Sequence, residues 1–359
     1  MRALANILDF EKPILELEAR IQKLESGGKR SDLAAIKELK KNLESLKQEV
    51  FSSLSAWETV QVARHPDRPQ TSDYIEFMTE DFVELHGDRT FSDDHAIMTG
   101  FATVDGQKLA LIGQQKGKST KEKIACYFGC AHPEGYRKAL RIMRMAAKFA
   151  MPVVTLIDTP GAYPGIGAEE RGQAQIIAVN LRDMSRLRTP VINIVIGEGG
   201  SGGALGIAVG DRLAILEHAY YSVISPEGCA AILWKSGETA AEAAEALKLT
   251  AKRLHELGIA DDIIPEPLGG AHRDPKQTAQ NVKKQILKYL KELKKFTIDE
   301  LLENRYKKLR SIGQVLEGES ADRAVAEAMT QYPASEEPAA TSESKDETPP
   351  PEEKTDQTE

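Results

Sequence analysis

Apolar residues return every three or four positions in two stretches at the start of the chain. The first stretch places them at Ile7, Phe10, Ile14, Leu17, Ile21 and Leu24, and the second at Ile36, Leu39, Leu43, Leu46 and Val50. This spacing is typical of a heptad seam along one face of a helix. Between the stretches, Gly27 and Gly28 end the first helix, and Ser31 or Asp32 can cap the second. The pattern predicts an antiparallel helical hairpin that packs either against the rest of the chain or against a partner chain.

A segment with two prolines separates this hairpin from the main part of the chain. The prolines of residues 65–72 predict a linker that ends in a helix cap. A helix is then indicated by the apolar residues Tyr74, Ile75, Met78, Phe82 and Leu85. We therefore expect the hairpin and linker over residues 1–70, a main domain over residues 71–315 and a C-terminal extension over residues 316–359.

The main domain changes from a hairpin pattern to an alternation of helices and apolar strands. Two short apolar runs within residues 101–112 flank Asp105-Gly106, which predicts a type I′ turn. Further on, we predict helices over about residues 133–149 and 168–187 and strands over residues 153–157, 191–196, 213–216 and 220–224. Strands that are apolar on both faces and separated by helices indicate an α/β fold with a parallel sheet. The functional groups of such sheets gather at the carboxyl ends of the strands.

The net charge of −8 comes almost entirely from the end of the chain. Residues 333–359 hold nine acidic residues and two lysines, a net charge of −7. This segment has too few apolar residues to offset its ordering entropy, so we expect a disordered tail. The chain contains no run of 18 apolar residues, and acidic residues interrupt the apolar pattern of its first positions. These features predict neither a membrane span nor a secretion signal and favour the cytoplasm.

The cysteines do not indicate a disulfide framework or a metal site. Cys126, Cys130 and Cys229 are too few and too unevenly placed for disulfide pairing. Cys126, Cys130 and His132 lie close together in the sequence, but three residues separate the two cysteines and no second Cys/His pair follows. Metal binding is therefore disfavoured by the spacing rules for zinc.

Two glycine-rich segments follow two of the predicted strands. Residues 158–167 come after the strand at residues 153–157, and residues 197–206 come after the strand at residues 191–196. We expect each segment to form a turn whose backbone N–H groups have no side-chain cover. Such groups at the start of a helix bind anions or stabilise a developing oxyanion.

Two nucleotide-binding motifs are matched only in part. Residues 113–119 are similar to a Walker A loop and residues 158–161 to a GTPase DxxG, but three residues separate the two glycines where Walker A has four. Residues 197–202 read Gly-x-Gly-x-x-Gly, and Glu217 ends the next strand as in a dinucleotide-binding fold. Only about eight residues then precede that strand, which is short for a crossover helix. Neither nucleotide-binding interpretation is favoured.

A serine hydrolase is a further alternative. Gly199-x-Ser201-x-Gly203 matches the nucleophile elbow, and Asp211 and His218 follow in the chain order of α/β-hydrolases. The motif is short, however, and His218 is expected at the far end of the next strand. This position gives the triad a poor geometry.

Several longer runs identify a family more specifically. They are residues 115–117, 133–139, 157–167, 168–173, 197–205, 221–230, 232–235 and 264–272. Together they resemble the carboxyltransferase alpha subunit of bacterial acetyl-CoA carboxylase, a biotin-dependent carboxyltransferase, and the resemblance extends over roughly residues 1–315. It implies a crotonase-like (ClpP/crotonase) spiral of ββα units with an N-terminal helical hairpin. It also implies transfer of a carboxyl group from carboxybiotin to acetyl-CoA, which forms malonyl-CoA in the first committed step of fatty acid synthesis.

The implied reaction explains why glycines matter. Negative charge develops on the ureido oxygen of biotin and on the thioester oxygen of acetyl-CoA, and both oxyanions need donors already in place. By the family pattern, the backbone amides of Gly202, Gly203 and Ala204 form the oxyanion hole on the biotin side. The biotin nitrogen then accepts the proton, so that no catalytic Ser, His or Cys is required.

The resemblance also suggests residues that contact the substrates. The expected contacts are Gly161, Gly165, Gly199, Gly200, Arg171, Lys116 and Lys118. Cationic side chains attract the carboxylate or the CoA phosphates. For Lys116, Lys118, Lys121 and Lys123, a solvated loop is the alternative and the favoured interpretation.

The resemblance implies partners as well. Biotin is carried on a separate biotin carboxyl carrier protein, and a biotin carboxylase component uses ATP. Zinc belongs only to the carboxyltransferase beta subunit. That subunit pairs with this chain in a heterotetramer of two alpha and two beta chains, and acetyl-CoA and malonyl-CoA are its substrate and product. A non-catalytic scaffold with a degenerate site is the remaining alternative, and the intact glycines argue against it.

Overall fold

The computed structural model describes residues 8–27, 32–313, 318 and 323. The predictions for Ile7, for the helix break at residues 28–31 and for the tail from residue 333 concern residues outside these ranges. The described residues up to Ile312 form one compact unit. The expected division at residues 70 and 315 stays a prediction. Within the described ranges, no helix combines the length and apolar content that a membrane crossing needs.

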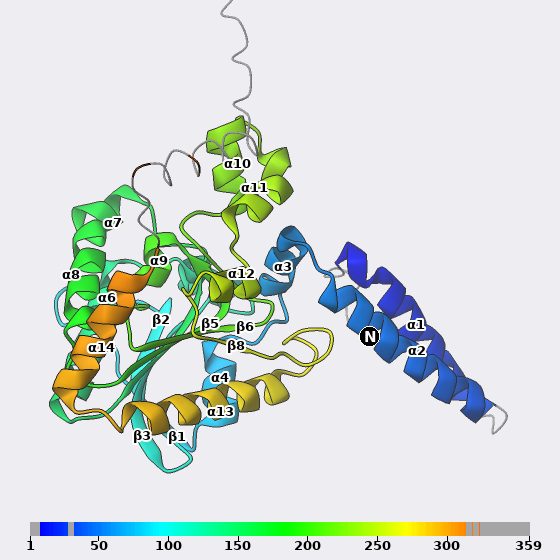
Figure 1. Ribbon diagram of the computed structural model, residues 1–359, viewed down its shortest axis with the longest axis horizontal. Coiled ribbons are helices and arrows are strands. Elements are labelled where there is room, and N and C mark those ends of the chain that lie inside the picture. Colours follow the sequence, from blue (N-terminus) through cyan, green and yellow to red (C-terminus); the bar gives the residue numbers. More distant parts are fainter. Residues whose placement is uncertain (1–7, 28–31, 314–317, 319–322, 324–359) are drawn as a thin grey trace, which may run out of the picture. The chain divides into compact units, whose positions relative to one another are not determined.

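The N-terminal part is a helical hairpin, as the seam predicts (Figure 1). A short 3₁₀ helix, η2 (Asp9–Glu11), leads into α1 (Lys12–Gly27), which pairs with α2 (Leu33–Ser52). Ile14 of the seam is buried and packs with Phe51 and Val62. Because Val62 follows the hairpin in the chain, at least the base of the hairpin packs internally. Docking onto a partner chain stays a prediction.

The segment after the hairpin differs from the prediction in two places. An unpredicted helix, α3 (Ala56–Ala63), precedes the linker, and α4 (Thr71–Met78) ends before Phe82. The helix expected to continue to Leu85 is therefore wrong, because Phe82 lies in β1 (Asp81–Glu84). There it pairs with Ala102 of the neighbouring strand. Strand pairing thus overrides the helical spacing of these apolar residues.

An eight-stranded sheet forms the centre of the molecule. Its strand order is β1-β2-β3-β4-β5-β6-β8, and β7 pairs with the end of β5. β1 to β3 are antiparallel, and β3, β4, β5, β6 and β8 are parallel. The remaining strands are β2 (Ile97–Val104), β3 (Gln107–Gln114), β4 (Val153–Thr159), β5 (Val191–Gly200), β6 (Arg212–Leu216), β7 (Tyr220–Ser222) and β8 (Asp262–Ile264). The predicted parallel sheet is confirmed, and all residues of β4 and β5 are buried.

The predicted type I′ turn joins β2 to β3. Asp105 and Gly106 have φ values of 45° and 70°. A type I′ turn requires positive φ at both central residues, which Asp-Gly adopts more readily than most pairs.

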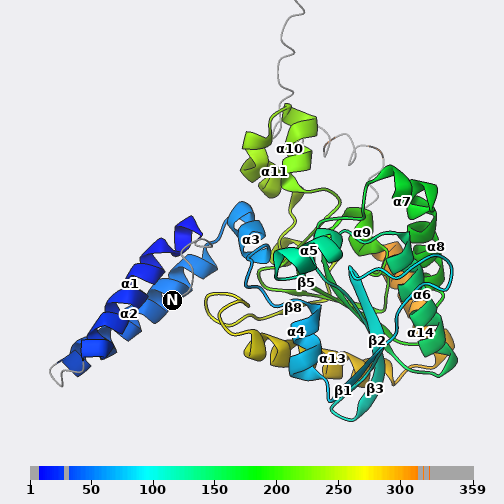
Figure 2. The same cartoon turned by 180° about the vertical axis from the view of Figure 1, so that it is seen from behind.

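Helices cover the sheet, and α6, α8 and α14 lie side by side while α13 packs with α4 (Figures 1 and 2). The helices after β3 are α5 (Thr120–Ala125), η4 (Tyr127–Gly129), α6 (Pro133–Lys148), α7 (Ile166–Glu170), α8 (Gln173–Ser185), α9 (Ser201–Leu205), α10 (Pro226–Trp234), η5 (Gly237–Thr239), α11 (Ala240–Leu247), α12 (Ala251–Glu256), α13 (Pro275–Leu293) and α14 (Ile298–Ser311). The single helix predicted over residues 168–187 is two helices. Gly172 between them has a φ of 84°, a left-handed conformation that interrupts a helix.

Arg305 fixes α14 to the sheet. Its buried guanidinium forms an ion pair with Asp211, with donor–acceptor distances of 2.7 and 2.8 Å. It also donates to the carbonyl oxygens of Met184, Leu187 and Thr189, at 2.8 to 2.9 Å. All these partners lie near the amino end of β5, so this contact stabilises the edge of the sheet opposite the glycine-rich segments.

Candidate active site

The second glycine-rich segment is not a turn at its start, because residues 197–200 continue β5. These residues are buried, and residues 198–200 pair with residues 220–222 of β7. The expected exposure of their backbone N–H groups is therefore wrong. The glycines instead permit close packing, since a Cβ on Gly200 would lie 2.9 Å from the carbonyl oxygen of Thr159. Gly199 and Gly200, expected as substrate contacts, belong to the sheet.

Backbone N–H groups that have no carbonyl partner inside their own element begin one residue further on, in α9. Ser201 has a left-handed φ of 52°, which turns the chain from β5 directly into this helix. The first N–H groups of an α-helix have no carbonyl partner inside it, and here they belong to Ser201, Gly202 and Gly203. The three predicted donors, Gly202, Gly203 and Ala204, all lie in α9, and their role at an oxyanion stays a prediction.

The first glycine-rich segment leaves β4 and packs against α9. A Cβ on Gly203 would lie 2.5 Å from the backbone nitrogen of Ala162 and 2.9 Å from the Cα of Gly161. The Gly161 N–H donates to the Thr159 hydroxyl oxygen at 3.1 Å. That hydroxyl oxygen also lies 2.7 Å from the carbonyl oxygen of Gly129. The fold therefore brings Gly161 and Gly203 together, as their places after neighbouring parallel strands predict.

A buried network of charges lies beneath these segments. The Lys116 ammonium is 2.6 Å from carboxylate oxygens of both Asp158 and Glu198. Arg64 also reaches Glu198, at 2.6 Å, and the Tyr220 hydroxyl donates to the same carboxylate at 2.6 Å. Burial alone would raise the pKa of Glu198, but the charges of Lys116 and Arg64 outweigh it and hold the pKa at about 2. Lys116 is therefore part of a network and not of a solvated loop.

A cavity of about 220 Å³ adjoins this network. Its lining includes Arg64, Lys116, Lys123, Phe128 and Glu198. Burial lowers the pKa of Lys116, and the charges of the two paired carboxylates raise it more, so its ammonium group stays protonated. The cavity therefore combines the exposed ring of Phe128 with the paired charges of Arg64, Lys116 and Glu198.

The other predicted cationic contacts are also paired within the chain. Arg171 donates to Glu134 at 2.7 Å and to the carbonyl oxygen of Gly167 at 2.6 Å. Lys118 forms an ion pair with Asp73. The predicted contact Gly165 opens α7 as its N-cap, where a Cβ would collide with the ring of Tyr163. Contact of these residues with a substrate stays a prediction.

Two buried polar side chains at this edge were missed by the sequence analysis. Gln114 ends β3 and donates to the carbonyl oxygen of Gly203 at 2.8 Å. The Tyr136 hydroxyl donates to the same oxygen at 3.2 Å. A glutamine shortly after the apolar run of residues 109–112 was the available signal, since a buried polar group needs a partner.

The geometry separates the three residues of the hydrolase alternative. Ser201 stands at a sharp strand-to-helix turn, as a nucleophile does. Asp211, however, accepts a hydrogen bond from the Val191 N–H at the amino end of β5, about 30 Å along the strand from Ser201 at 3.3 Å per residue. The ring of His218 packs edge-on against Phe51, with 5.5 Å between the ring centroids. Among the described residues, this trio therefore forms no triad.

The cysteines and His132 are placed in different environments. Burial raises the pKa of the Cys126 thiol to about 11 and also raises that of Cys130. Metal binding needs thiolates, so both environments oppose it. His132 stacks on Tyr163, with 4.0 Å between the ring centroids. These contacts indicate packing roles.

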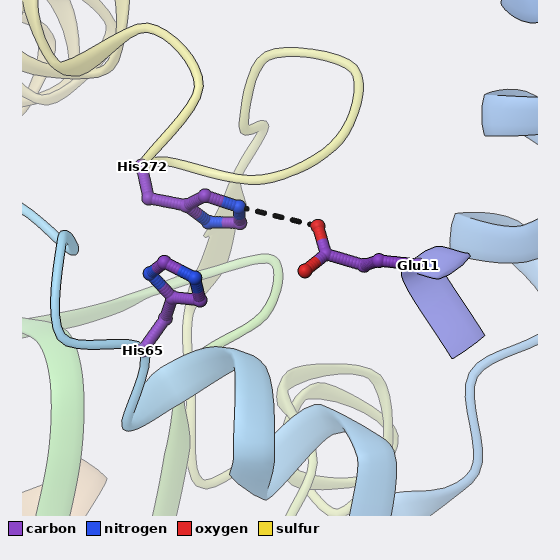
Figure 3. A group of neighbouring side chains, drawn as sticks. All are labelled: Glu11, His65 and His272. Carbon is purple, nitrogen blue, oxygen red and sulfur yellow. Dashed lines mark ion pairs between the residues drawn. The ribbon is translucent and has the colours of Figure 1, made fainter. Parts of the chain in front are cut away.

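Within the described ranges, Glu11, His65 and His272 form the group with metal-ligand spacing (Figure 3). Figure 3 shows the His272 ring facing the Glu11 carboxylate, at 3.4 Å. The Nδ1 atom of His65 accepts the Asp67 N–H at 3.1 Å, so the ring proton belongs on Nε2, where a cation would have to bind. The two histidine rings stack with centroids 4.0 Å apart, and Arg273 places a positive charge 3.1 Å from Glu11. The cluster suits a contact between the hairpin and the main domain better than a metal ion.

Comparison with known proteins agrees with this arrangement. Residues 7–313 match the family model described as acetyl co-enzyme A carboxylase carboxyltransferase-like. The acetyl-coenzyme A carboxylase carboxyl transferase subunit alpha of Geobacter metallireducens is 55% identical over 312 residues, 86% of this chain and 98% of the relative. The same subunit of Rhodopirellula baltica is 56% identical with the same coverage.

A solved structure resembles the fold. Transcarboxylase 12S with hydrolysed methylmalonyl-coenzyme A bound has a TM-score of 0.52 and 18% identity, and the match covers 70% of this chain. This chain spans less than half of that one, 44% of its length. The likeness confirms the crotonase-like α/β fold. Together with the family match, it shows that the chain belongs to the carboxyltransferase family of acetyl-coenzyme A carboxylase.

Proposed function

We propose that this chain is the carboxyltransferase alpha subunit that transfers a carboxyl group from carboxybiotin to acetyl-CoA, forming malonyl-CoA. The observation that carries the proposal is the pair Gly202 and Gly203 at the start of α9. Their N–H groups have no carbonyl partner inside the helix, and they directly follow the carboxyl end of the central strand β5. Relatives that share more than half of this sequence are named as this subunit, which supports the same assignment.

The chemistry that biotin supplies when bound is a carboxyl group to transfer and a ureido oxygen that takes up negative charge. The residues present suit such a group, because a Cβ at Gly202 would meet nothing nearer than Ile177 at 3.7 Å, which leaves space beside the start of α9. We assign the amides of Gly202 and Gly203 to the oxyanion. Donors held in place before the reaction need no reorganisation, and each is typically worth about 3 to 4 kcal/mol of transition-state stabilisation.

Gly161 remains in the proposal because it packs against Gly203 of α9, and Gly165 remains as a predicted substrate contact at the start of α7. Gly199 and Gly200 enter it through close packing of β5 and β7, because their backbone belongs to the sheet. Lys116, Lys118 and Arg171 would supply positive charge for a carboxylate or a phosphate, each shared with the carboxylate it already binds. These three assignments are less direct than those of Gly202 and Gly203.

A beta subunit that completes the site is supported by apolar side chains exposed around it. Five large apolar residues on or near α7, α9 and α10 are between 41% and 81% exposed: Ile166, Leu205, Val223, Ile232 and Leu233. Exposed apolar side chains mark protein interfaces where they lie next to one another. The proposal includes a zinc-bearing beta subunit in a heterotetramer, a biotin carboxyl carrier protein, and a biotin carboxylase that uses ATP. It places this assembly in the cytoplasm.

The experiment is reconstitution. We expect the isolated chain to be inactive and the chain mixed with the beta subunit to decarboxylate malonyl-CoA in the presence of biotin, because the site lies between two chains. The beta subunit alone is the matched control. Full turnover by the isolated chain would contradict the shared site, and an assembled complex without turnover would favour a non-catalytic scaffold.

A further inference from the structure

Gln114 joins three segments that meet at the proposed site. Its side chain is fully buried at the end of β3. The Nε2 group donates to the carbonyl oxygen of Gly203 at 2.8 Å, and Oε1 accepts the Asp158 N–H at 3.0 Å. The orientation of the amide follows from these partners, because a carbonyl can only accept and a backbone N–H can only donate. One side chain therefore connects β3, the end of β4 and α9.

Both groups that Gln114 binds lack the usual backbone partner. The pairing of β4 with β5 shifts register between Ile157 and Thr159, which leaves Asp158 at an irregularity. In α9, the Ile207 N–H bonds to the Ala204 carbonyl and not to that of Gly203. A buried backbone group without a partner is costly, so the glutamine amide completes the backbone at both points.

The five-residue helix α9 depends on such contacts for its orientation. A helix this short gains too few internal hydrogen bonds to be stable alone, and tertiary contacts decide where it lies. Gln114 and Tyr136 both hold the Gly203 carbonyl oxygen, at 2.8 and 3.2 Å. The carboxylate of Asp158 continues the connection, because it accepts the Glu198 N–H on β5 at 2.9 Å.

We propose that Gln114 is a positioning residue of the carboxyltransferase site, which holds α9 so that the amides of Gly202 and Gly203 stay aimed at the oxyanion. This inference rests on the proposed function. Gln114 acts through the Gly203 carbonyl and contacts no substrate itself. Tyr136 is the weaker second support, since its hydroxyl is further from the same oxygen.

The test uses the complex of this chain with its beta subunit and the biotin-dependent decarboxylation of malonyl-CoA. Gln114→Leu removes both hydrogen bonds, whereas Gln114→Glu keeps an acceptor for the Asp158 N–H and, when ionised, loses the donor to Gly203. We expect both to lower kcat about 30- to 100-fold with little change in the KM for malonyl-CoA, the scale of a misplaced catalytic group. Tyr136→Phe should lower kcat only about threefold, in keeping with a weak neutral hydrogen bond.

Gln115→Leu is the matched control. Gln115 is the next residue, and its amide bonds to Gln70 and Ser72, away from α9. We expect this variant to keep the kcat of the unchanged complex. Thermal unfolding and gel filtration of each variant give the assembled fraction, by which kcat is normalised. Gln114→Glu provides the measurement if Gln114→Leu does not fold.

Gly203→Val separates this inference from the proposed function. If Gly203→Val abolishes turnover while assembled Gln114→Glu keeps an ordinary kcat, the positioning role is wrong and the proposed site stands. If Gly203→Val keeps ordinary turnover, the proposed site itself is wrong. A loss in both Gln114 variants that disappears after normalisation for assembly would reduce Gln114 to a purely structural residue and overturn the inference.

Discussion

Replacing Gly203 tests a position where the structure leaves no room for a side chain. A Cβ there would lie 2.5 Å from the Ala162 nitrogen, whereas an ordinary contact begins at 3.4 Å. Either α9 or the turn at Gly161 must then move by about 0.9 Å, the difference between these distances. A displacement of about 1 Å can lower a catalysed rate about a hundredfold, which corresponds to about 2.7 kcal/mol of activation free energy. Gly203→Ala should reach this loss, and Gly203→Val should exceed it because its branched side chain crowds the anion as well.

The assay is biotin-dependent decarboxylation of malonyl-CoA by the complex with the beta subunit, with assembly measured by gel filtration. Gly202→Ala is an instructive comparison, because its Cβ would meet only Ile177, at 3.7 Å, and the backbone amide stays in place. We expect it to lose less activity than Gly203→Ala. A Cβ at Gly237 would have no heavy atom within 4 Å. Gly237→Ala is therefore the control for losses of activity that arise from the preparation of a variant and not from its position. Ordinary turnover by assembled Gly203→Val would refute the proposed role of α9.

Three further predictions concern other parts of the molecule. Ser201→Ala should keep nearly all activity, and a fluorophosphonate probe should not label the unchanged chain; labelling at Ser201 would support the hydrolase alternative. The pKa of Glu198 is depressed to about 2 from an ordinary 4.5. Its contribution to the free energy of unfolding is therefore complete above about pH 4.5 and lost as the pH falls towards 2. Urea unfolding across this range should show a shallower pH dependence for Glu198→Gln, and an identical slope would contradict the network. Arg305→Leu should lower the free energy of unfolding by about 3 to 5 kcal/mol, because it leaves the Asp211 carboxylate buried without its partner. An unchanged melting temperature would contradict this, and Arg188→Leu, whose ion pair with Asp299 is exposed, is the control.

Periodicity predicted those elements whose partners are close in the sequence or whose burial is uniform. The hairpin α1–α2, the type I′ turn at Asp105-Gly106 and the buried strands β4 and β5 belong to this group. The apolar residues around Phe82 have helical spacing but lie in a strand, because β2 supplies the pairing and its position is unknown to the local sequence. Likewise, Gly172 was visible in the sequence, but only its left-handed φ divides the predicted helix into α7 and α8.

The site itself was harder to predict, because its groups are mainly backbone groups. The glycine pattern located the segment, but only the structure separates residues 197–200, which belong to β5, from the open amides of α9. Gln114 gave no motif, since its two partners are far from it in the sequence, 44 and 89 residues away. The charged residues near the site could not be interpreted one at a time as substrate contacts, because Lys116 and Arg171 are each paired with a buried carboxylate.

A site made of backbone amides has a consequence for how its mechanism is tested. A backbone amide stays in place when a side chain is deleted. The informative substitutions therefore either add a side chain that displaces the backbone, as at Gly203, or remove a hydrogen bond that holds it, as at Gln114. The two kinds of change act on the same helix through different contacts, since a Cβ on Gly203 would meet the turn at Gly161 and its carbonyl oxygen accepts from Gln114. If both act through the orientation of α9, the loss of kcat in the double variant, expressed as a free energy, should be smaller than the sum of the two single losses. The reason is that the first substitution has already displaced the helix. Fully additive losses in a double variant would show that they act through separate routes.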